Sequence, residues 1–403
     1  MNIKYLITFI FLGGLSFGPT PAATIIVSEG DDLQKAIENA GDDDTLAIEP
    51  GIYKAIPVNF TDSLCGNCLE HRTPVAAGRG FLIKGKSLHL IGRNREKTVL
   101  HTGAGYGLFF VDSPGSSVRN LTITGGRRDA DGNATDAAVV VRNSRINLTE
   151  LDIINNDNRI DSIVVGIGGV FGREGADIIL NNCSIINNSW DGVALYRGSS
   201  AIVRDCLIKD GRGAGIGVTW DAVCTAYRNI VTGYWKGIGA FGTAWVTARN
   251  NAVYDNLGWG MIATGNSFMD IANNVVYYNG NCGVAVWSNE CTGRIVNNII
   301  IENGWKKEWV CPCVGVWNYG DWSKWDFSYN IVWNNKEGDY RDIRDQTGVN
   351  GNLDVNPEFI GESIFLLTKG SPAIDAGHPE IYDNDGSRSD IGLNGGPQGK
   401  ARR

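Results

Sequence analysis

Charged side chains recur in three consecutive stretches of this 403-residue chain. In chain order they are Asp191, Arg197, Asp210, Arg212, Asp221 and Lys236. Lysine can remove a proton from carbon, and arginine or lysine can neutralise a carboxylate next to that carbon. Arginine is a poor base in water, so as a base it would need desolvation or neighbouring cations. We therefore take Asp191, Arg197, Arg212 and Lys236 as candidate catalytic residues.

Two other interpretations of these charges stay open. The carboxylates of Asp191, Asp210 and Asp221 are the kind of oxygen ligand that Ca²⁺ takes in proteins. Equally, all of the charges can be ordinary solvated groups on loops.

Aromatic residues accompany the charges. All twelve tryptophans lie between Trp190 and Trp333. Sugars stack their C–H faces on exposed aromatic rings, so a row of rings suits an extended glycan. The candidate substrate-binding residues are Tyr196, Trp220, Trp235, Trp287 and Trp317. Alternatively, the rings only cover loops packed on the fold.

A repeat positions these residues. Equivalent positions 183, 206, 229, 251, 274, 298 and 330 are separated by 23, 23, 22, 23, 24 and 32 residues, and most carry asparagine. A glycine series that begins at Gly192 keeps the same period. Such a unit is too short for a helix plus a strand with both connections, but it accommodates three short strands with turns. Stacked turns would align asparagine amides in a ladder, with Cys183 and Cys206 as small buried members.

These repeats resemble the pectin-lyase-like superfamily of right-handed parallel β-helices. The segment 32–40 followed by Gly41-Asp42-Asp43-Asp44-Thr45-Leu46 and Pro50-Gly51-Ile52-Tyr53 is similar to the family's N-terminal capping helix and first strand. The resemblance implies an all-β, single-stranded solenoid with a short N-terminal capping helix. Spacings of 31 and 32 residues near the start, and the last 32-residue step, are loop insertions at 126–135, 156–161 and 304–313.

In this superfamily the ligand groove runs along the first strand of each coil. The resemblance implies that pairs of residues face outward there, namely Ala194 and Tyr196, Gly217 and Thr219, Gly239 and Phe241, Ile262 and Thr264, and Ala285 and Trp287. It also implies a polysaccharide lyase-like enzyme that cleaves an acidic glycan by β-elimination. The stretch Ala194-Leu195-Tyr196-Arg197-Gly198 is similar to an arginine-containing strand of alginate-type lyases.

Other activities of the superfamily fit the sequence less well. The Asn-Thr-Asp and Arg-Ile-Lys motifs of pectin-type hydrolases and the Asp-Pro-His-Asp motif of mannuronan epimerases do not occur in the sequence. The Gly-His dipeptide of the hydrolases occurs at Gly377-His378, outside the regular coils from 183 to 300. A non-catalytic exported β-helix that binds glycan or serves as a surface protein therefore stays open as the alternative.

The N-terminal residues predict export. One lysine, an apolar run from Leu6 to Phe17 and small residues up to Ala23 are typical of a cleaved signal peptide. We expect a signal at 1–23, a cap and first coil at 24–60, repeats at 61–335 and a closing segment at 336–403. The protein is then secreted, periplasmic or at the cell surface, without membrane insertion, and we expect a monomer.

Charge and cysteine content narrow the partners. The net charge of −8, without clustered lysine and arginine, excludes nucleic acid as a main ligand. The resemblance implies a polysaccharide as the partner. Nine cysteines include the close pairs Cys65/Cys68 and Cys311/Cys313. An exported chain permits disulfides, so we interpret Cys65-x-x-Cys68 as a loop staple rather than a zinc or redox motif.

Near the C-terminus, Asp383, Asp385 and Asp390 place carboxylates at the alternating spacing that a Ca²⁺ loop uses. Gly386 permits a sharp turn between them. The sequence thus predicts Ca²⁺ as the one candidate cofactor, with a plain aspartate-rich turn as the alternative.

Overall fold

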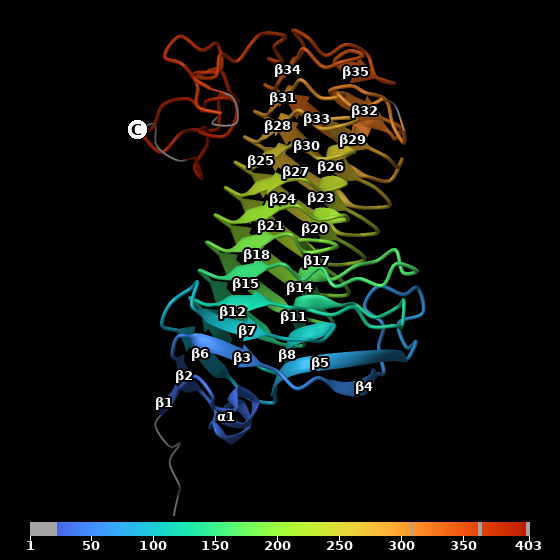
Figure 1. Ribbon diagram of the computed structural model, residues 1–403. Helices are drawn as coiled ribbons and strands as arrows, with labels where there is room; N and C mark the ends of the chain where they lie inside the picture. The colour runs from blue at the N-terminus through green and yellow to red at the C-terminus, as the bar shows by residue number, and fades with distance from the viewer. Residues whose placement is uncertain (1–21, 308, 362–364, 400–403) are drawn as a thin grey trace, which may run out of the picture.

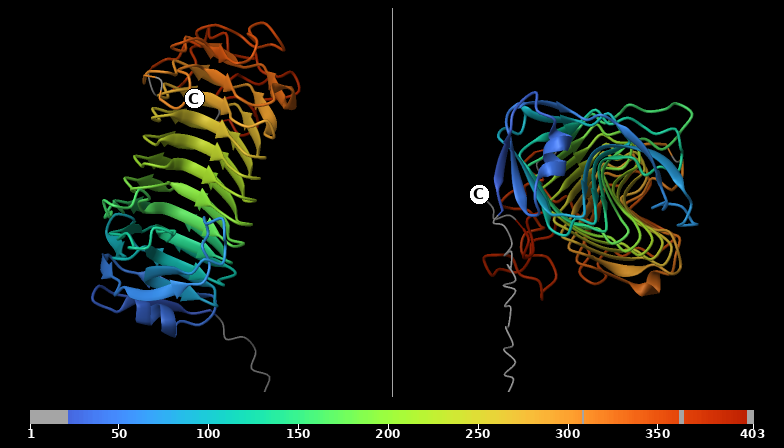
Figure 2. Two further views of the ribbon diagram at one scale, coloured as in Figure 1. Left: turned by 90° about the vertical axis from the view of Figure 1, so that its right-hand side faces the viewer. Right: turned by 90° about the horizontal axis from the view of Figure 1, so that it is seen from below.

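The computed structural model describes residues 22–307, 309–361 and 365–399. Within these ranges the strands stack into three long sheets, which wind around one axis as a parallel β-helix (Figures 1 and 2). We name these sheets A, B and C, and each coil contributes one strand to each sheet in the order C, A, B. The predicted fold is confirmed, whereas most of the predicted signal peptide lies outside the described residues.

Sheet A contains the following strands: β1 (Thr24–Val27), β2 (Asp44–Ile48), β6 (Leu88–Gly92), β9 (Ser116–Arg119), β12 (Arg145–Thr149), β15 (Asp177–Asn181), β18 (Ser200–Arg204), β21 (Val223–Tyr227), β24 (Trp245–Arg249), β27 (Phe268–Ala272), β30 (Thr292–Val296) and β33 (Trp325–Ser328). Sheet B contains β3 (Gly51–Lys54), β7 (Thr98–His101), β10 (Thr122–Thr124), β13 (Asp152–Ile154), β16 (Ser184–Ile186), β19 (Leu207–Lys209), β22 (Ile230–Thr232), β25 (Ala252–Tyr254), β28 (Val275–Tyr277), β31 (Ile299–Ile301) and β34 (Ile331–Trp333).

Sheet C contains β4 (Val58–Asp62), β5 (Val75–Lys84), β8 (Tyr106–Val111), β11 (Ala137–Arg142), β14 (Gly168–Arg173), β17 (Val193–Leu195), β20 (Ala214–Val218), β23 (Lys236–Ala240), β26 (Trp259–Ala263), β29 (Val284–Val286), β32 (Val316–Asn318) and β35 (Tyr340–Arg341). Its pairs are parallel except for the antiparallel pair β4 and β5. A short 3₁₀ helix, η1 (Trp322–Lys324), precedes β33.

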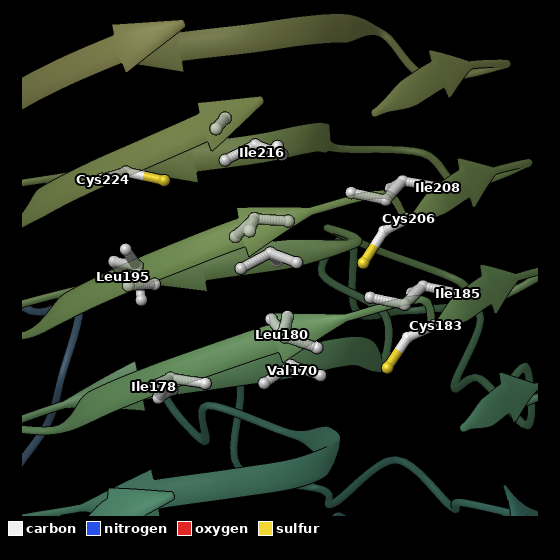
Figure 3. Close-up of a cluster of buried hydrophobic side chains, with 14 of the residues drawn as sticks. Val170, Ile178, Leu180, Cys183, Ile185, Leu195, Cys206, Ile208, Ile216 and Cys224 are labelled. Atoms are coloured by element: carbon white, nitrogen blue, oxygen red, sulfur yellow. The ribbon is translucent and has the colours of Figure 1, made fainter. Parts of the chain in front are cut away.

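The interior is a continuous column of aliphatic side chains. Strands alternate inward and outward residues, so each coil sends a few apolar side chains to the centre. Figure 3 shows Val170, Leu180, Ile185 and Leu195 meeting there, with Cys183 and Cys206 among them. Each fully buried side chain of this size stabilises the fold by about 1.5–3 kcal/mol.

The N-terminal end of the column is covered by helix α1 (Leu33–Asn39), as predicted (Figure 1). The Asp32 side chain caps this helix by accepting a hydrogen bond from the Lys35 N–H. Leu33 and Ile37 join the interior cluster. The helix therefore shields an end that would otherwise expose apolar side chains and unpaired strand edges.

The predicted asparagine ladder is present between sheets A and B. Its hydrogen-bonded members are Asn229, Asn251, Asn274, Asn298, Asn330 and Asn352. Asn274 Oδ1 accepts both the backbone N–H of Asn251 at 2.9 Å and its Nδ2 at 3.0 Å. The residue before each ladder position has a positive φ, and these residues are as different as Asp205, Arg228 and Tyr329. The ladder asparagines therefore contribute hydrogen bonds and do not supply the left-handed backbone of the turn.

A second ladder, which we did not predict from the sequence, lies in the turns between sheets B and C. Its members are Asn256, Asn279, Asn303 and Asn335. Residues 365–399 add a third use of asparagine. They pack along the outer face of sheet B (Figure 1), whereas β35 and Asn352 continue the stack of coils. Asn250 and Asn273 donate to the carbonyls of Leu393 and Asp390 in that segment.

Replacing Asn274 by alanine should lower thermal stability. It removes the acceptor of the Asn251 N–H and the donor to the Ala248 carbonyl, both buried in the turn. Two orphaned groups cost about 2–5 kcal/mol together. We expect the apparent Tm at a fixed scan rate to fall by several degrees. The exposed Asn266→Ala is the matched control, and equal Tm values for the two variants would contradict the role of the ladder.

Candidate functional site

The outer face of sheet C carries the residues predicted to face outward. Ala194, Gly217, Gly239, Ile262 and Ala285 share one register across five strands. Their neighbours Val193, Ile216 and Ile238 point into the interior cluster, so alternation places the first set outside.

One acidic and one basic residue flank the strand β20 on this face. Ala214 pairs in register with Lys236 of the next coil, and its N–H donates to Asp191 Oδ1 of the previous coil at 2.6 Å. Asp191 and Lys236 therefore lie on either side of one small residue. We call them the Asp191–Lys236 pair.

Glycine is needed beneath the pair. A Cβ on Gly217 would lie 3.3 Å from the Ala214 Cβ and 3.5 Å from Asp191 Oδ2. A Cβ on Gly239 would lie 2.5 Å from the ring of Phe241, which leans over this strand. Larger residues at either position would displace a side chain of the site, so the floor consists of backbone and small residues.

The environment shifts the pKa of both members. Burial raises the pKa of Asp191 to about 6, while the Ala214 N–H and Lys236 oppose that shift. Burial lowers the pKa of Lys236, and the Asp191 charge partly restores it. The ammonium lies 3.9 Å from the ring centroid of Trp235 and 5.6 Å from that of Phe241. At neutral pH Asp191 is thus mainly ionised, and Lys236 gives up its proton more easily than an ordinary lysine does.

Arg197 is engaged elsewhere. Its guanidinium donates to the carbonyls of Gly66 and Cys68 and stacks on Trp220 at 4.7 Å. Gly66 and Cys68 belong to the loop between β4 and β5, where Cys65 and Cys68 form the expected staple disulfide. Arg197 therefore holds this loop against sheet C.

A buried polar network anchors the same loop, and sequence reasoning missed it. The guanidinium of Arg173 contacts Asp62 at 3.1 Å and Glu174 at 2.6 Å, and it donates to Tyr106 and Thr135. Burying charge is tolerated only when it is paired and hydrogen-bonded, as here. The sequence carries one signal of this network: Arg173 is the last residue of strand β14, whose other residues are glycine or apolar.

Arg212 and the aromatic rings define a groove beside the pair, in the turns that precede sheet C. Trp190, Trp235, Trp305 and Trp309 line a cavity of about 520 Å³ together with Arg212. The rings of Trp235 and Trp309 are 5.6 Å apart. We call it the tryptophan groove. The exposed Arg212 also lines a neighbouring polar hollow of about 350 Å³.

The other predicted aromatic residues are more enclosed. Tyr196 is buried against Phe171, and burial and then the Asp191 charge raise its pKa well above the ordinary value. Trp287 packs between Trp259 and Trp317. Trp317 is only 7% exposed and donates to Asp342 at 2.9 Å. These last rings stabilise the sheet face, whereas Trp305 and Trp309, which we had not chosen, are open to solvent.

The predicted Ca²⁺ ligands accept hydrogen bonds from the chain itself. Asp383 takes the N–H groups of Asp390 and Gly396, Asp390 takes that of Asp375, and Asp385 takes that of Ser387. Among the described residues no group of three or more His, Cys, Asp or Glu side chains is arranged to hold a metal ion. The donor set does not fit a calcium cage, and we derive no step through a metal.

Comparison with known proteins places this geometry in context. The family model described as the right handed beta helix region matches residues 76–231 and 168–336. No curated protein sequence matches significantly. Within the described residues, no helix is long and apolar enough to cross a membrane.

Solved structures resemble most of the chain at low identity. The crystal structure of pectate lyase Pel9A is 14% identical, has a TM-score of 0.51, and aligns over 93% of this chain and 97% of that one. An alginate lyase from Paenibacillus sp. str. FPU-7 is 14% identical with a TM-score of 0.45, over 79% and 99% of the two chains. The A-module of the Azotobacter vinelandii mannuronan C-5 epimerase AlgE6 is 12% identical with a TM-score of 0.39, over 81% and 96%. At such identities the likeness concerns the fold alone.

The Lys236 amine should titrate below an ordinary lysine. Competitive acetylation across pH, read by mass spectrometry of the peptide that contains residue 236, measures this directly. Asp191→Asn should lower the pKa of Lys236 further, because the carboxylate charge that stabilises the ammonium is lost. The exposed Lys54 serves as the control site. An unchanged or raised pKa of Lys236 in Asp191→Asn would show that the two groups do not interact.

Proposed function

The chain belongs to the right-handed β-helix family, and from this premise we propose that it is a carbohydrate-active enzyme that cleaves an acidic polysaccharide by β-elimination. The observation that carries the proposal is the Asp191–Lys236 pair on the outer face of sheet C, over a floor of Ala214 and Gly217. A desolvated lysine within the electrostatic reach of a buried carboxylate, in a face lined by aromatic rings, is equipped to take a proton from a sugar carbon.

In the proposed reaction neutral Lys236 removes the proton from the carbon that bears the uronate carboxylate. The electron pair of that C–H bond forms a carbon–carbon double bond, and the bond to the glycosidic oxygen breaks. The leaving oxygen takes a proton from water, since the Tyr196 hydroxyl is buried, and the Lys236 ammonium then returns the abstracted proton to solvent. Asp191 is a positioning residue, because it holds the ammonium form of Lys236 after proton transfer.

The uronate carboxylate needs a cation during the reaction. Arg212 is exposed and borders the tryptophan groove, so we assign this role to it rather than to Arg197, whose Nε and Nη2 donate to loop carbonyls. The open rings of Trp305 and Trp309 then bind neighbouring sugars. The apolar N-terminal run supports action outside the cytoplasm, on a polymer that cannot enter the cell.

The test is a screen of the purified protein against alginate, polygalacturonate, chondroitin and heparan, reading the ultraviolet absorbance of the unsaturated uronate. Loss of a general base lowers the rate by about 10²–10⁴-fold, so Lys236→Ala should abolish most of the signal. Lys54→Ala, an exposed strand lysine at the far end of the solenoid, is the matched control. Full activity in Lys236→Ala would refute the assignment.

A non-catalytic glycan-binding protein is the second candidate, and the tryptophan groove favours it independently of Lys236. Trp309 is 51% exposed, so its ring can stack on a sugar and is not part of the buried interior. Trp309→Ala should weaken oligosaccharide binding at least fivefold in calorimetry, since stacking contributes about 1 kcal/mol or more. The exposed Trp245 on sheet A provides the control Trp245→Ala. Binding to the groove with no product from any polymer would favour this second function.

A further inference from the structure

Three cysteine sulfurs gather beneath the loop that carries Trp305 and Trp309. Cys311 and Cys313 lie in this loop, which connects β31 to β32, and Cys282 lies just before β29 on the coil below. All three side chains are buried. Cys282 and Cys311 have their Sγ atoms 3.1 Å apart.

We propose that Cys282 and Cys311 are a redox modification site, at which a disulfide fixes the Trp305–Trp309 loop over the tryptophan groove. A disulfide bond is about 2.05 Å long, so closing it requires a movement of about 1 Å. Cys311 lies outside any strand, so its Sγ can move by this distance without a change in strand pairing.

The chemistry needs a low-molecular-weight disulfide as oxidant. One of the two thiols attacks it as the thiolate, forms a mixed disulfide and releases one reduced thiol. The second cysteine then displaces the other half. The balance is two protein thiols and one small disulfide giving one protein disulfide and two small thiols.

Two further observations support the site. The loop between β4 and β5, which also lies against sheet C, is already closed by the Cys65–Cys68 disulfide. In addition, Cys311 follows Trp309 by two residues, and the Trp309 ring contacts Trp235 across the groove. A covalent link at Cys311 therefore restrains a ring that borders the groove, whereas a link elsewhere in the solenoid would not.

Peptide mapping tests the proposal on the full chain. The protein is incubated with oxidised glutathione, unfolded with N-ethylmaleimide present, and digested with trypsin without reduction. We expect residues 250–294 linked to 308–324, through Cys282 and Cys311. The link should be absent in Cys282→Ser and present in Cys291→Ser, a buried cysteine of the same peptide that faces Ser267 instead. Alkylation of both Cys282 and Cys311, or a link from Cys311 to Cys313, overturns the proposal.

Native-state proteolysis provides a second readout, whose main comparison uses the wild-type protein alone. Trypsin can cut the loop after Lys306 and Lys307. Oxidised wild-type protein should be cut there at least tenfold more slowly than the same protein after reduction. Cys282→Ser should show no such dependence. Equal cutting of oxidised and reduced wild type would show that no disulfide restrains the loop.

Discussion

The stacking of asparagine amides between coils is the interaction on which the rest of the structure depends. Each ladder asparagine bonds the turn above and the turn below, and its backbone and side chain are both involved. Because the bonds repeat at one position per coil, they fix the register between neighbouring coils. Deep burial leaves these amides no water to bond instead, so a coil out of register would orphan several polar groups at once.

Register in turn creates the site. Successive residues of a strand point to opposite faces, so a slip by one residue would bring Ile216 or Ile238 to the outer face and turn Gly217 or Gly239 inward. In the correct register, Asp191, Ala214 and Lys236 come from three consecutive coils and meet on one face. The site therefore needs no long-range loop to assemble its acid–base pair. The flanking loops supply walls and aromatic rings, and the Arg173 network and Arg197 hold one of these walls in place.

The sequence predicted the solenoid well because its period is repeated many times. The asparagine positions, the glycine series and the capping helix at 32–40 each pointed to the same fold, and the structure contains all three. The second ladder was harder to see, since Asn256, Asn279 and Asn303 stand among turns of varied sequence. The contacts of Asn250 and Asn273, the first asparagines of their pairs, were hidden too, because they involve a segment more than one hundred residues away.

The candidate site was predictable only in part. Asp191 and Lys236 were chosen from their spacing, and the structure brings them together; Arg197, chosen on the same grounds, is bound to a loop whose path no repeat specifies. The tryptophan groove is lined in part by the insertion 304–313, which does not follow the repeat, so the repeat could not predict it. The most direct test of the central claim is a crystal structure of Lys236→Ala with an acidic oligosaccharide. We expect a uronate over Gly217, with its acidic carbon facing the vacated position 236. An oligosaccharide bound only in the tryptophan groove, with the face of β20 empty, would contradict it.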